Sequence, residues 1–353
     1  MMWLDRLGCT LPIVQAPMAG VSTPAMAVAV SGAGALGSIG IGAADVAGAA
    51  AMIAGVRAGT ARAFNVNVFV HPAPGVDPAR EAAWIERLRA AFERFGAVPP
   101  EGLRTIYTSF ADDDAMQAML VEAAPPVVSF HFGLPRAEVI AALRARGVVT
   151  LATATNVAEA RAIAAAGIDG IVAQGIEAGG HRGLFDADAD DPALGTMALV
   201  PLLVRATALP VIAAGGIMNG AGIAAALDLG AVAAQLGTAF VGCDESAADA
   251  GYRAALFGEA AYRTVMTRAI SGRPARALAN LFTALGEGWE AEVPDYPRAY
   301  DVGKALHAAA LACGESGFGA QWAGQGAPLA RAMPARALVE TLAREWRAAS
   351  RGA

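Results

Sequence analysis

Lysine is almost absent from this chain, and cysteine and charge of either sign are scarce. Lys304 is the only lysine among 353 residues, charged residues make up 16% of the chain, and the net charge is −6. No basic stripe is present, so nucleic acid is not expected as a partner. Cys9, Cys243 and Cys313 are far apart and form no CxxC pair. Neither a disulfide framework nor a metal site is therefore predicted, and a reducing cytoplasm is the expected location.

Long uninterrupted hydrophobic runs are also missing. No charged residue occurs between Arg6 and Asp45, yet Pro12, Pro17 and Pro24 and many glycines interrupt that stretch. A membrane-spanning helix needs about 18 or more consecutive apolar residues. We therefore expect a buried strand, helix and strand here, and no membrane association.

The chain instead alternates short apolar runs with alanine-rich amphipathic stretches, which is typical of βα units. Such alternation predicts a parallel sheet that is buried on both faces. Eight units favour a (β/α)8 TIM barrel, an α/β fold, over an open doubly wound sheet. The predicted strands are 13–17, 35–39, 64–70, 125–133, 148–153, 169–175, 209–216 and 231–240.

Two segments depart from this rhythm. Residues 71–110 read as an insertion on the third unit, and residues 243–315 look helical, with no convincing strand. We expect a barrel domain over 1–242 plus 316–353, closed by an amphipathic C-terminal helix. Residues 243–315 are expected to form a smaller, mainly helical subdomain on the substrate side.

Two glycine-containing turns follow the seventh and eighth predicted strands. Because the active site of such a barrel lies at the carboxyl ends of its strands, these turns are candidates for a phosphate site. Glycine lets backbone N–H groups approach a phosphate, and Thr238 adds a hydroxyl. The alternative is that the glycines only make tight turns. The residues concerned are Gly215, Gly216, Gln235, Leu236, Gly237 and Thr238.

Two amide side chains and one histidine complete the candidate site. Asn65 lies within an apolar strand and Gln174 ends another, and such amides suit the edge of a heterocycle such as an isoalloxazine, or form satisfied core contacts. His181 directly follows Gly179 and Gly180, which would let the backbone pass close to a flat ligand. A neutral imidazole there can accept a proton or bond an oxyanion. Its alternative is a solvated loop histidine.

Eight motifs, in order along nearly the whole chain, resemble those of the nitronate monooxygenase family, formerly called 2-nitropropane dioxygenases. Each is weak alone, and their shared order makes the resemblance strong. They are QAPMAG (15–20), FNVNVF (64–69), AQGIEAGGHRG (173–183), VIAAGGI (211–217), AAQLGTAF (233–240), SGRPARAL (271–278), YPRAYDVGKAL (296–306) and QWAGQGAP (321–328).

The resemblance implies an FMN-dependent barrel that oxidises alkyl nitronates with O2, without NAD(P)H, to a carbonyl compound and nitrite. It places the turn Pro17, Met18, Ala19 and Gly20 near the reactive edge of the flavin, and Asn65, Gln174, Gly179, Gly180, Gly215, Gly216 and Gln235 to Thr238 around the cofactor. It also implies that Tyr296, Tyr300 and Lys304 face the substrate, and that His181 is catalytic. The resemblance suggests propionate 3-nitronate as a substrate. The protein is expected to be a monomer or a homodimer.

Alternatives remain open at this point. The FMN-dependent enoyl-acyl-carrier-protein reductase has a similar EAGGH loop but needs NAD(P)H. Barrels similar to inosine-monophosphate dehydrogenase use a loop cysteine, and no cysteine here lies in a comparable loop. A flavin-binding protein without turnover is a third alternative. Lys304 could also be a surface residue, and Glu177 is the only nearby carboxylate that could orient His181.

Overall fold

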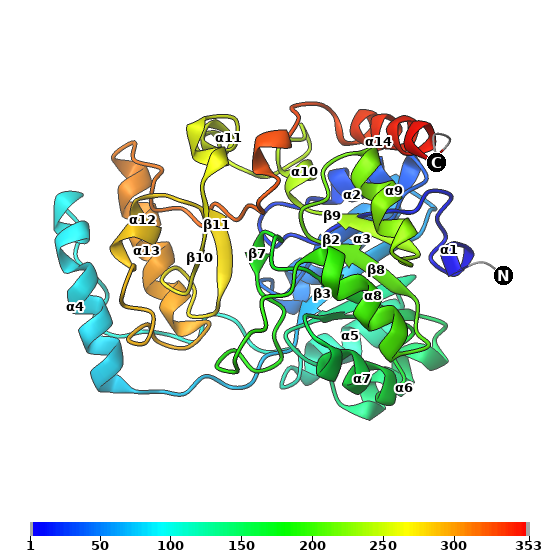
Figure 1. Ribbon diagram of the computed structural model, residues 1–353. Coiled ribbons are helices and arrows are strands. Elements are labelled where there is room, and N and C mark those ends of the chain that lie inside the picture. The colour runs from blue at the N-terminus through cyan, green and yellow to red at the C-terminus, as the bar shows by residue number, and fades with distance from the viewer. Residues whose placement is uncertain (1–2, 351–353) are drawn as a thin grey trace.

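The computed structural model describes residues 3–350 and contains a closed barrel of eight parallel strands (Figure 1). Neighbouring strands pair in the order β1-β9-β8-β6-β5-β4-β3-β2, and a parallel bridge between Val14 and Leu36 joins the first to the last. The eight predicted strands and the (β/α)8 fold are therefore confirmed. The strands are β1(Ile13–Gln15), β2(Gly37–Gly40), β3(Phe64–Phe69), β4(Val127–His131), β5(Val149–Ala154), β6(Gly170–Gln174), β8(Val211–Ala214) and β9(Ala233–Leu236).

Helices surround this barrel, and as a result each strand is buried on both faces. Small side-chain caps fix where several helices begin: Asp45, Asn156 and Asn219 each accept a backbone N–H from the first helical turn. The C-terminal helix α14(Ala335–Ala349) packs on α9 and α2, as predicted for a closing helix. The other barrel helices are α2(Pro24–Gly32), α3(Val46–Gly59), α5(Asp114–Ala123), α6(Ala137–Ala145), α7(Val157–Ala165), α8(Thr196–Ala206), α9(Gly220–Asp228) and α10(Thr238–Val241), and α1(Trp3–Arg6) lies near the N-terminus.

A second lobe lies beside the barrel, on the left of Figure 1. It contains a three-stranded antiparallel sheet in the order β10-β11-β7, so the expectation that 243–315 lacks strands was wrong. Its strands are short, and the partner of β11 on one side is β7, about 95 residues earlier, which no local pattern reveals. Its elements are β7(Gly180–His181), α11(Ala250–Leu256), η1(Glu259–Tyr262), β10(Thr264–Thr267), β11(Ala275–Leu278), α12(Leu281–Leu285), α13(Arg298–Ala312) and, towards the barrel, η2(Ala327–Leu329).

The inserted segment 71–110 joins this second lobe. Its helix α4(Pro78–Arg94) packs on α13, and the two lie side by side in Figure 1. Trp84 and Leu88 are fully buried in one hydrophobic cluster with Val302 and Leu306 of α13. The domain boundaries proposed above stay a prediction, but the packing of α4 favours counting the insertion with the smaller lobe.

Within residues 3–350, no helix combines the length and the apolar character that crossing a bilayer requires.

Candidate active site

A cavity of about 270 Å³ lies where the carboxyl ends of the barrel strands meet the smaller lobe. Its walls come from the ends of seven barrel strands and from the segments around α13 and η2, so the site depends on both lobes. Sixteen of the predicted site residues line it. They are Pro17, Met18, Ala19, Gly20, Gln174, Gly179, Gly180, His181, Gly215, Gly216, Gln235, Gly237, Thr238, Tyr296, Tyr300 and Lys304.

One side of the cavity is main chain, which we call the glycine wall: Gly179, Gly215, Gly216, Gly237 and Gly324. Gly215 and Gly216 have φ of +119° and +70°, a region that other residues rarely adopt. A Cβ on Gly179 would lie 2.5 Å from the Gly324 nitrogen, so these two segments touch only because neither has a side chain. The wall therefore presents backbone groups to a ligand.

Thr238 ties the glycine wall together. Its hydroxyl oxygen accepts the Gly324 N–H at 2.9 Å, which anchors the 321–328 segment over the turn after β9. Because that oxygen acts as an acceptor, the hydroxyl hydrogen can be donated to a second group. Backbone N–H groups next to such a hydroxyl suit a phosphate, so this wall can bind the phosphate group of a ligand.

Glu177 holds the loop after β6 but does not orient His181. Its carboxylate accepts the Thr196 N–H at 2.9 and 3.0 Å and the Thr196 hydroxyl at 2.9 Å, at the N-terminus of α8. A carboxylate is stabilised by the unpaired N–H groups and the dipole of a helix start. The idea that Glu177 orients the imidazole was therefore wrong.

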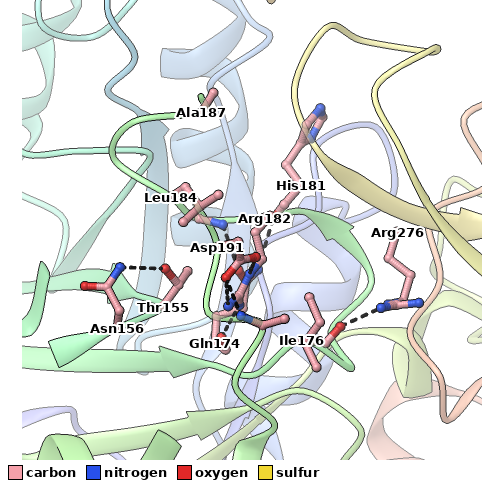
Figure 2. Close-up of polar contacts among 12 residues, drawn as sticks. Thr155, Asn156, Gln174, Ile176, His181, Arg182, Leu184, Ala187, Asp191 and Arg276 are labelled. Atoms are coloured by element: carbon pink, nitrogen blue, oxygen red, sulfur yellow. Dashed lines mark hydrogen bonds and ion pairs between the residues drawn. The ribbon is translucent and has the colours of Figure 1, made fainter. Parts of the chain in front are cut away.

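Gln174 fixes the same loop from inside the barrel (Figure 2). Its Nε2 donates to the His181 carbonyl at 3.0 Å, and its Oε1 accepts the Gly183 N–H at 2.7 Å. Arg182 pairs with Asp191 through two hydrogen bonds of 2.7 and 3.0 Å, and also donates to the Gln174 carbonyl. His181 and Arg182 point to opposite sides of the loop in Figure 2. The amide of Gln174 thus fixes the shape of the loop, and Gln174 also lines the cavity.

His181 is a buried, neutral imidazole. Burial, with smaller effects from His131, Arg273 and His71, lowers its pKa to about 3. Its Nε2 lies 2.9 Å from the Ser271 hydroxyl, which is the group that orients the ring. Burial in a desolvated pocket therefore keeps the ring neutral, and its hydrogen-bond partner is a hydroxyl and not a carboxylate.

His131 stands behind this loop. Its Nε2 is 3.1 Å from the His181 carbonyl oxygen and its Nδ1 is 3.0 Å from the Thr153 hydroxyl. Since a carbonyl only accepts, Nε2 carries the hydrogen and Nδ1 accepts from Thr153. Burial lowers the pKa of His131 to about 4, so this ring is neutral as well.

The opposite side of the cavity is made of side chains, which we call the aromatic wall: Tyr107, Tyr296, Tyr300, Trp322 and Lys304. Tyr300 and Lys304 are four residues apart and therefore lie on one face of α13. The Lys304 Nζ lies 5.0 and 5.6 Å from the ring centroids of Tyr107 and Tyr300. Burial raises the pKa of Tyr107 and of Tyr300 to about 12, so both hydroxyls keep their protons. This wall offers donors and one positive charge.

Two predicted residues, Asn65 and Leu236, do not line the cavity. Asn65 lies beneath it: its Nδ2 donates to the Ser129 hydroxyl oxygen at 2.9 Å, and its buried Oδ1 has no partner within the described residues. Asn67, two residues on and so on the same side of β3, lines the cavity and donates to the same hydroxyl at 2.9 Å. The alternation of the strand is the signal that could have identified Asn67.

Several other residues at the site were not predicted individually. The Ser129 hydroxyl accepts hydrogen bonds from the amides of Asn65 and Asn67, so its own hydrogen can be donated to a ligand in the cavity. Thr153 and His131, near the ends of their strands, line the same cavity. Tyr107 and Trp322 come from irregular segments whose position depends on the tertiary fold. Ser271 is the clearest omission, since it contacts His181 from 90 residues away.

Comparisons with known proteins identify the family of this chain. The model of the family described as "Nitronate monooxygenase" matches residues 3–345. The chain is 60% identical to a nitronate monooxygenase from Paraburkholderia phytofirmans, over 97% of this chain and 94% of that protein. It is 54% identical to a nitronate monooxygenase from Pseudomonas aeruginosa, over 97% of each.

Two solved structures are also similar over almost the whole chain. A nitroalkane oxidase from Streptomyces ansochromogenes has a TM-score of 0.90 and 42% identity, and covers 99% of both chains. FabK from Thermotoga maritima has a TM-score of 0.75 and 29% identity, covering 99% of this chain and 96% of that one. FabK stands for the alternative of an enoyl-acyl-carrier-protein reductase. That alternative is less well supported than a nitronate monooxygenase, because the similarity to FabK is lower.

Proposed function

This chain belongs to the nitronate monooxygenase family, a flavin-dependent family of oxidoreductases, and we propose that it oxidises alkyl nitronates with FMN and O2. The products would be a carbonyl compound and nitrite, and NAD(P)H would not be needed. One observation carries the proposal. A single cavity joins the glycine wall, suited to a phosphate, to the aromatic wall, which offers one cation and protonated tyrosines to a small anion.

We propose FMN, rather than a larger flavin, as the cofactor. The phosphate would bind at Gly216, Gly237 and Thr238, where backbone N–H groups and a hydroxyl meet. The ring system would extend past the Met18 turn and Gln174 towards the loop of His181. Bound flavin would supply the redox chemistry, accepting electrons from the nitronate and passing them on to O2.

The side chains of this protein would bind and orient the anion. Lys304 is exposed at the cavity, and its charge attracts a nitronate before the tyrosines hold it. Tyr300 and Tyr296 would donate hydrogen bonds, since a tyrosine with a raised pKa is protonated at neutral pH. His181, neutral and held by Ser271, would hydrogen-bond the nitro group.

Substrate scope and setting belong to the same proposal. Propionate 3-nitronate has a second negative charge, which Lys304 at the cavity mouth would favour. A monomer or a homodimer is expected. A cytoplasmic location is inferred from Cys9, Cys243 and Cys313, which are free thiols.

An oxygen-electrode assay on the purified, FMN-loaded protein tests this function. Propionate 3-nitronate and an alkyl nitronate should each consume O2 and release nitrite at the same rate with and without NADH. Protein stripped of FMN is the control and should be inactive until FMN is restored. NADH oxidation with an enoyl thioester, and no O2 uptake with any nitronate, would move the assignment to the reductase. Flavin binding with no turnover of either substrate would leave a flavin-binding protein.

A further inference from the structure

Arg273 is a buried cation without a carboxylate partner. It lies in the connection between β10 and β11 with 3% of its surface exposed. One terminal nitrogen donates to the Leu184 carbonyl, while its buried Nε has no hydrogen-bond partner. Among the ion pairs of residues 3–350, none includes Arg273, whereas the equally buried Arg182 pairs with Asp191. A charge this well buried is costly unless something compensates it.

The ring of Phe132 lies between Arg273 and two residues that line the cavity, His181 and Tyr296. Its guanidinium carbon is 4.2 Å from the ring centroid of Phe132. That ring lies 5.6 Å from the His181 ring and 5.7 Å from the Tyr296 ring. Phe132 has a φ of +77°, rare for a bulky residue, so surrounding structure must hold it in this conformation. The arrangement keeps the guanidinium near the site but out of contact with solvent.

The groups that face Arg273 do not neutralise it. His71, His131 and His181 are each neutral, and Arg273 is one cause of the lowered pKa of each. The pKa of Arg273 itself falls to about 10 through burial, so it stays charged at neutral pH. Of the carboxylates that act on it, Asp186 and Asp188, the second is mostly exposed and already pairs with Arg268 at 2.8 Å.

The Tyr296 hydroxyl is the other group without a partner in this region. It is buried, with no hydrogen-bond partner within the described residues, and the charge of Arg273 acts on it. A protonated hydroxyl beside a fixed cation is a stronger donor to an anion in the cavity. Tyr296 lines the cavity, and the ring of Phe132 contacts both Tyr296 and Arg273, so the charge and the unused donor lie at the same end of the cavity.

We propose that Arg273 is the fixed positive charge that makes this cavity select small anions, acting through Phe132 and Tyr296 without touching the substrate. It is a positioning residue, and a bound anion would supply its missing counter-charge. The identity of that anion as a nitronate rests on the proposed function. Lys304 does not make Arg273 redundant, because Lys304 is exposed to solvent and screened by it.

Nitrate binding to the FMN-loaded enzyme tests this inference independently of turnover. Nitrate is a planar anion with the same two-oxygen edge as a nitronate, and its binding is followed by the change in flavin absorbance. Arg273→Met should weaken nitrate binding by about tenfold or more, since a unit charge some 10 Å away in a poorly solvated site has roughly that effect. The matched control is Arg268→Met, which removes a charge from the same loop at an ion-paired position and should change nitrate binding less than about twofold.

Arg273→Lys separates charge from packing. Lysine keeps the charge but cannot stack flat on Phe132, so nitrate affinity within about threefold of the natural protein supports a charge effect. A loss in Arg273→Lys as large as in Arg273→Met, or an Arg273→Met enzyme that binds nitrate normally with FMN retained, would overturn it. If Arg273→Met does not fold, the lysine variant alone decides by the same limits.

Substrate selectivity gives the second readout. In Arg273→Met, kcat/KM should fall about tenfold more for a nitronate than for its neutral nitroalkane, which a merely structural role would not produce. An equal fall for both would count against the proposal. Should no nitronate be turned over at all, the proposed function fails, while nitrate binding still decides the role of Arg273.

Discussion

At one end of the cavity, Gly215, Gly216 and Gly237 bring main chain to the surface, whereas at the other end Tyr296, Tyr300 and Lys304 reach in from the smaller lobe. The glycine wall works by the absence of side chains, and three of its glycines directly follow the barrel strands β8 and β9. The aromatic wall works by the presence of side chains on elements far apart in sequence. Adding atoms should therefore damage the first wall, and removing atoms should damage the second.

Gly216→Asp should cause the largest effect, the loss of FMN. It places an L side chain at a φ of +70° and a negative charge where a phosphate would bind. We expect FMN binding to weaken by about 100-fold or more, equivalent to about 2.7 kcal/mol, measured from the flavin absorbance of purified protein. Gly147→Asp is the control, because Gly147 has a φ of +78° with open space around it, far from the cavity. An equal loss of FMN in both variants would show that strain alone, and no phosphate site, is involved.

Mild acid should destabilise the fold through the histidines near the aromatic wall. The pKa of His131 is about 4 and that of His181 about 3, against about 6.5 in an unfolded chain. As pH falls below 6.5 the unfolded chain gains protons that the folded one does not, so stability is complete above pH 6.5 and falls below it. Between pH 7.5 and 5 each histidine should remove roughly 2 kcal/mol from the free energy of unfolding.

Urea unfolding at several pH values measures this slope. His131→Gln cannot titrate at that position and should lose the roughly 2 kcal/mol that this histidine contributes to the pH dependence, whatever its effect on stability at pH 7.5. A free energy of unfolding that is constant from pH 7.5 to 5 would contradict the burial of both rings.

His181→Asn should reduce activity with nitronates and neutral nitroalkanes alike. With a pKa of about 3 and a serine as its partner, His181 is a weak base but a good hydrogen-bond donor or acceptor. Losing a charge-assisted hydrogen bond of about 1.5–3 kcal/mol would lower kcat/KM roughly 10- to 150-fold for both substrates. A fall of about 10²–10⁴ confined to the nitroalkane would instead identify a general base. Ser271→Ala, which removes only the orienting hydroxyl, should show a smaller loss of the same kind.

The two walls also differ in how far the sequence predicts them. The glycine turns after β8 and β9 are local features of the sequence, and Gly215, Gly216 and Gly237, which form the candidate phosphate site, all line the cavity. Residues that meet through tertiary packing were not found: Ser271 reaches His181 only because β11 pairs with β7. No local pattern marks such a non-local contact.

Two expectations for single residues depended on contact partners that the sequence does not show. Asn65 was expected at the cofactor but lies under Ser129, while Asn67 lines the cavity. Glu177 was the natural orienting group for His181 by proximity in sequence, yet the start of α8 binds its carboxylate. In both cases the residue type was informative and its partner could not be inferred without the fold.

Lys304→Met should have the smallest effect of these changes, confined to substrate binding. Lys304 is exposed and lies over the rings of Tyr107 and Tyr300, so its charge is partly screened by solvent. We expect KM for a nitronate to rise about tenfold, a change of about 1.4 kcal/mol, with FMN content unchanged because the glycine wall lies on the other lobe. Lys304→Arg keeps the charge and should restore most of the affinity. A second carboxylate on the substrate should enlarge the effect, so propionate 3-nitronate should suffer more than an alkyl nitronate of the same length. An unchanged KM for both substrates would mean that the single lysine of this chain is a surface residue, and that the positive charge of the aromatic wall comes from the buried arginine behind it.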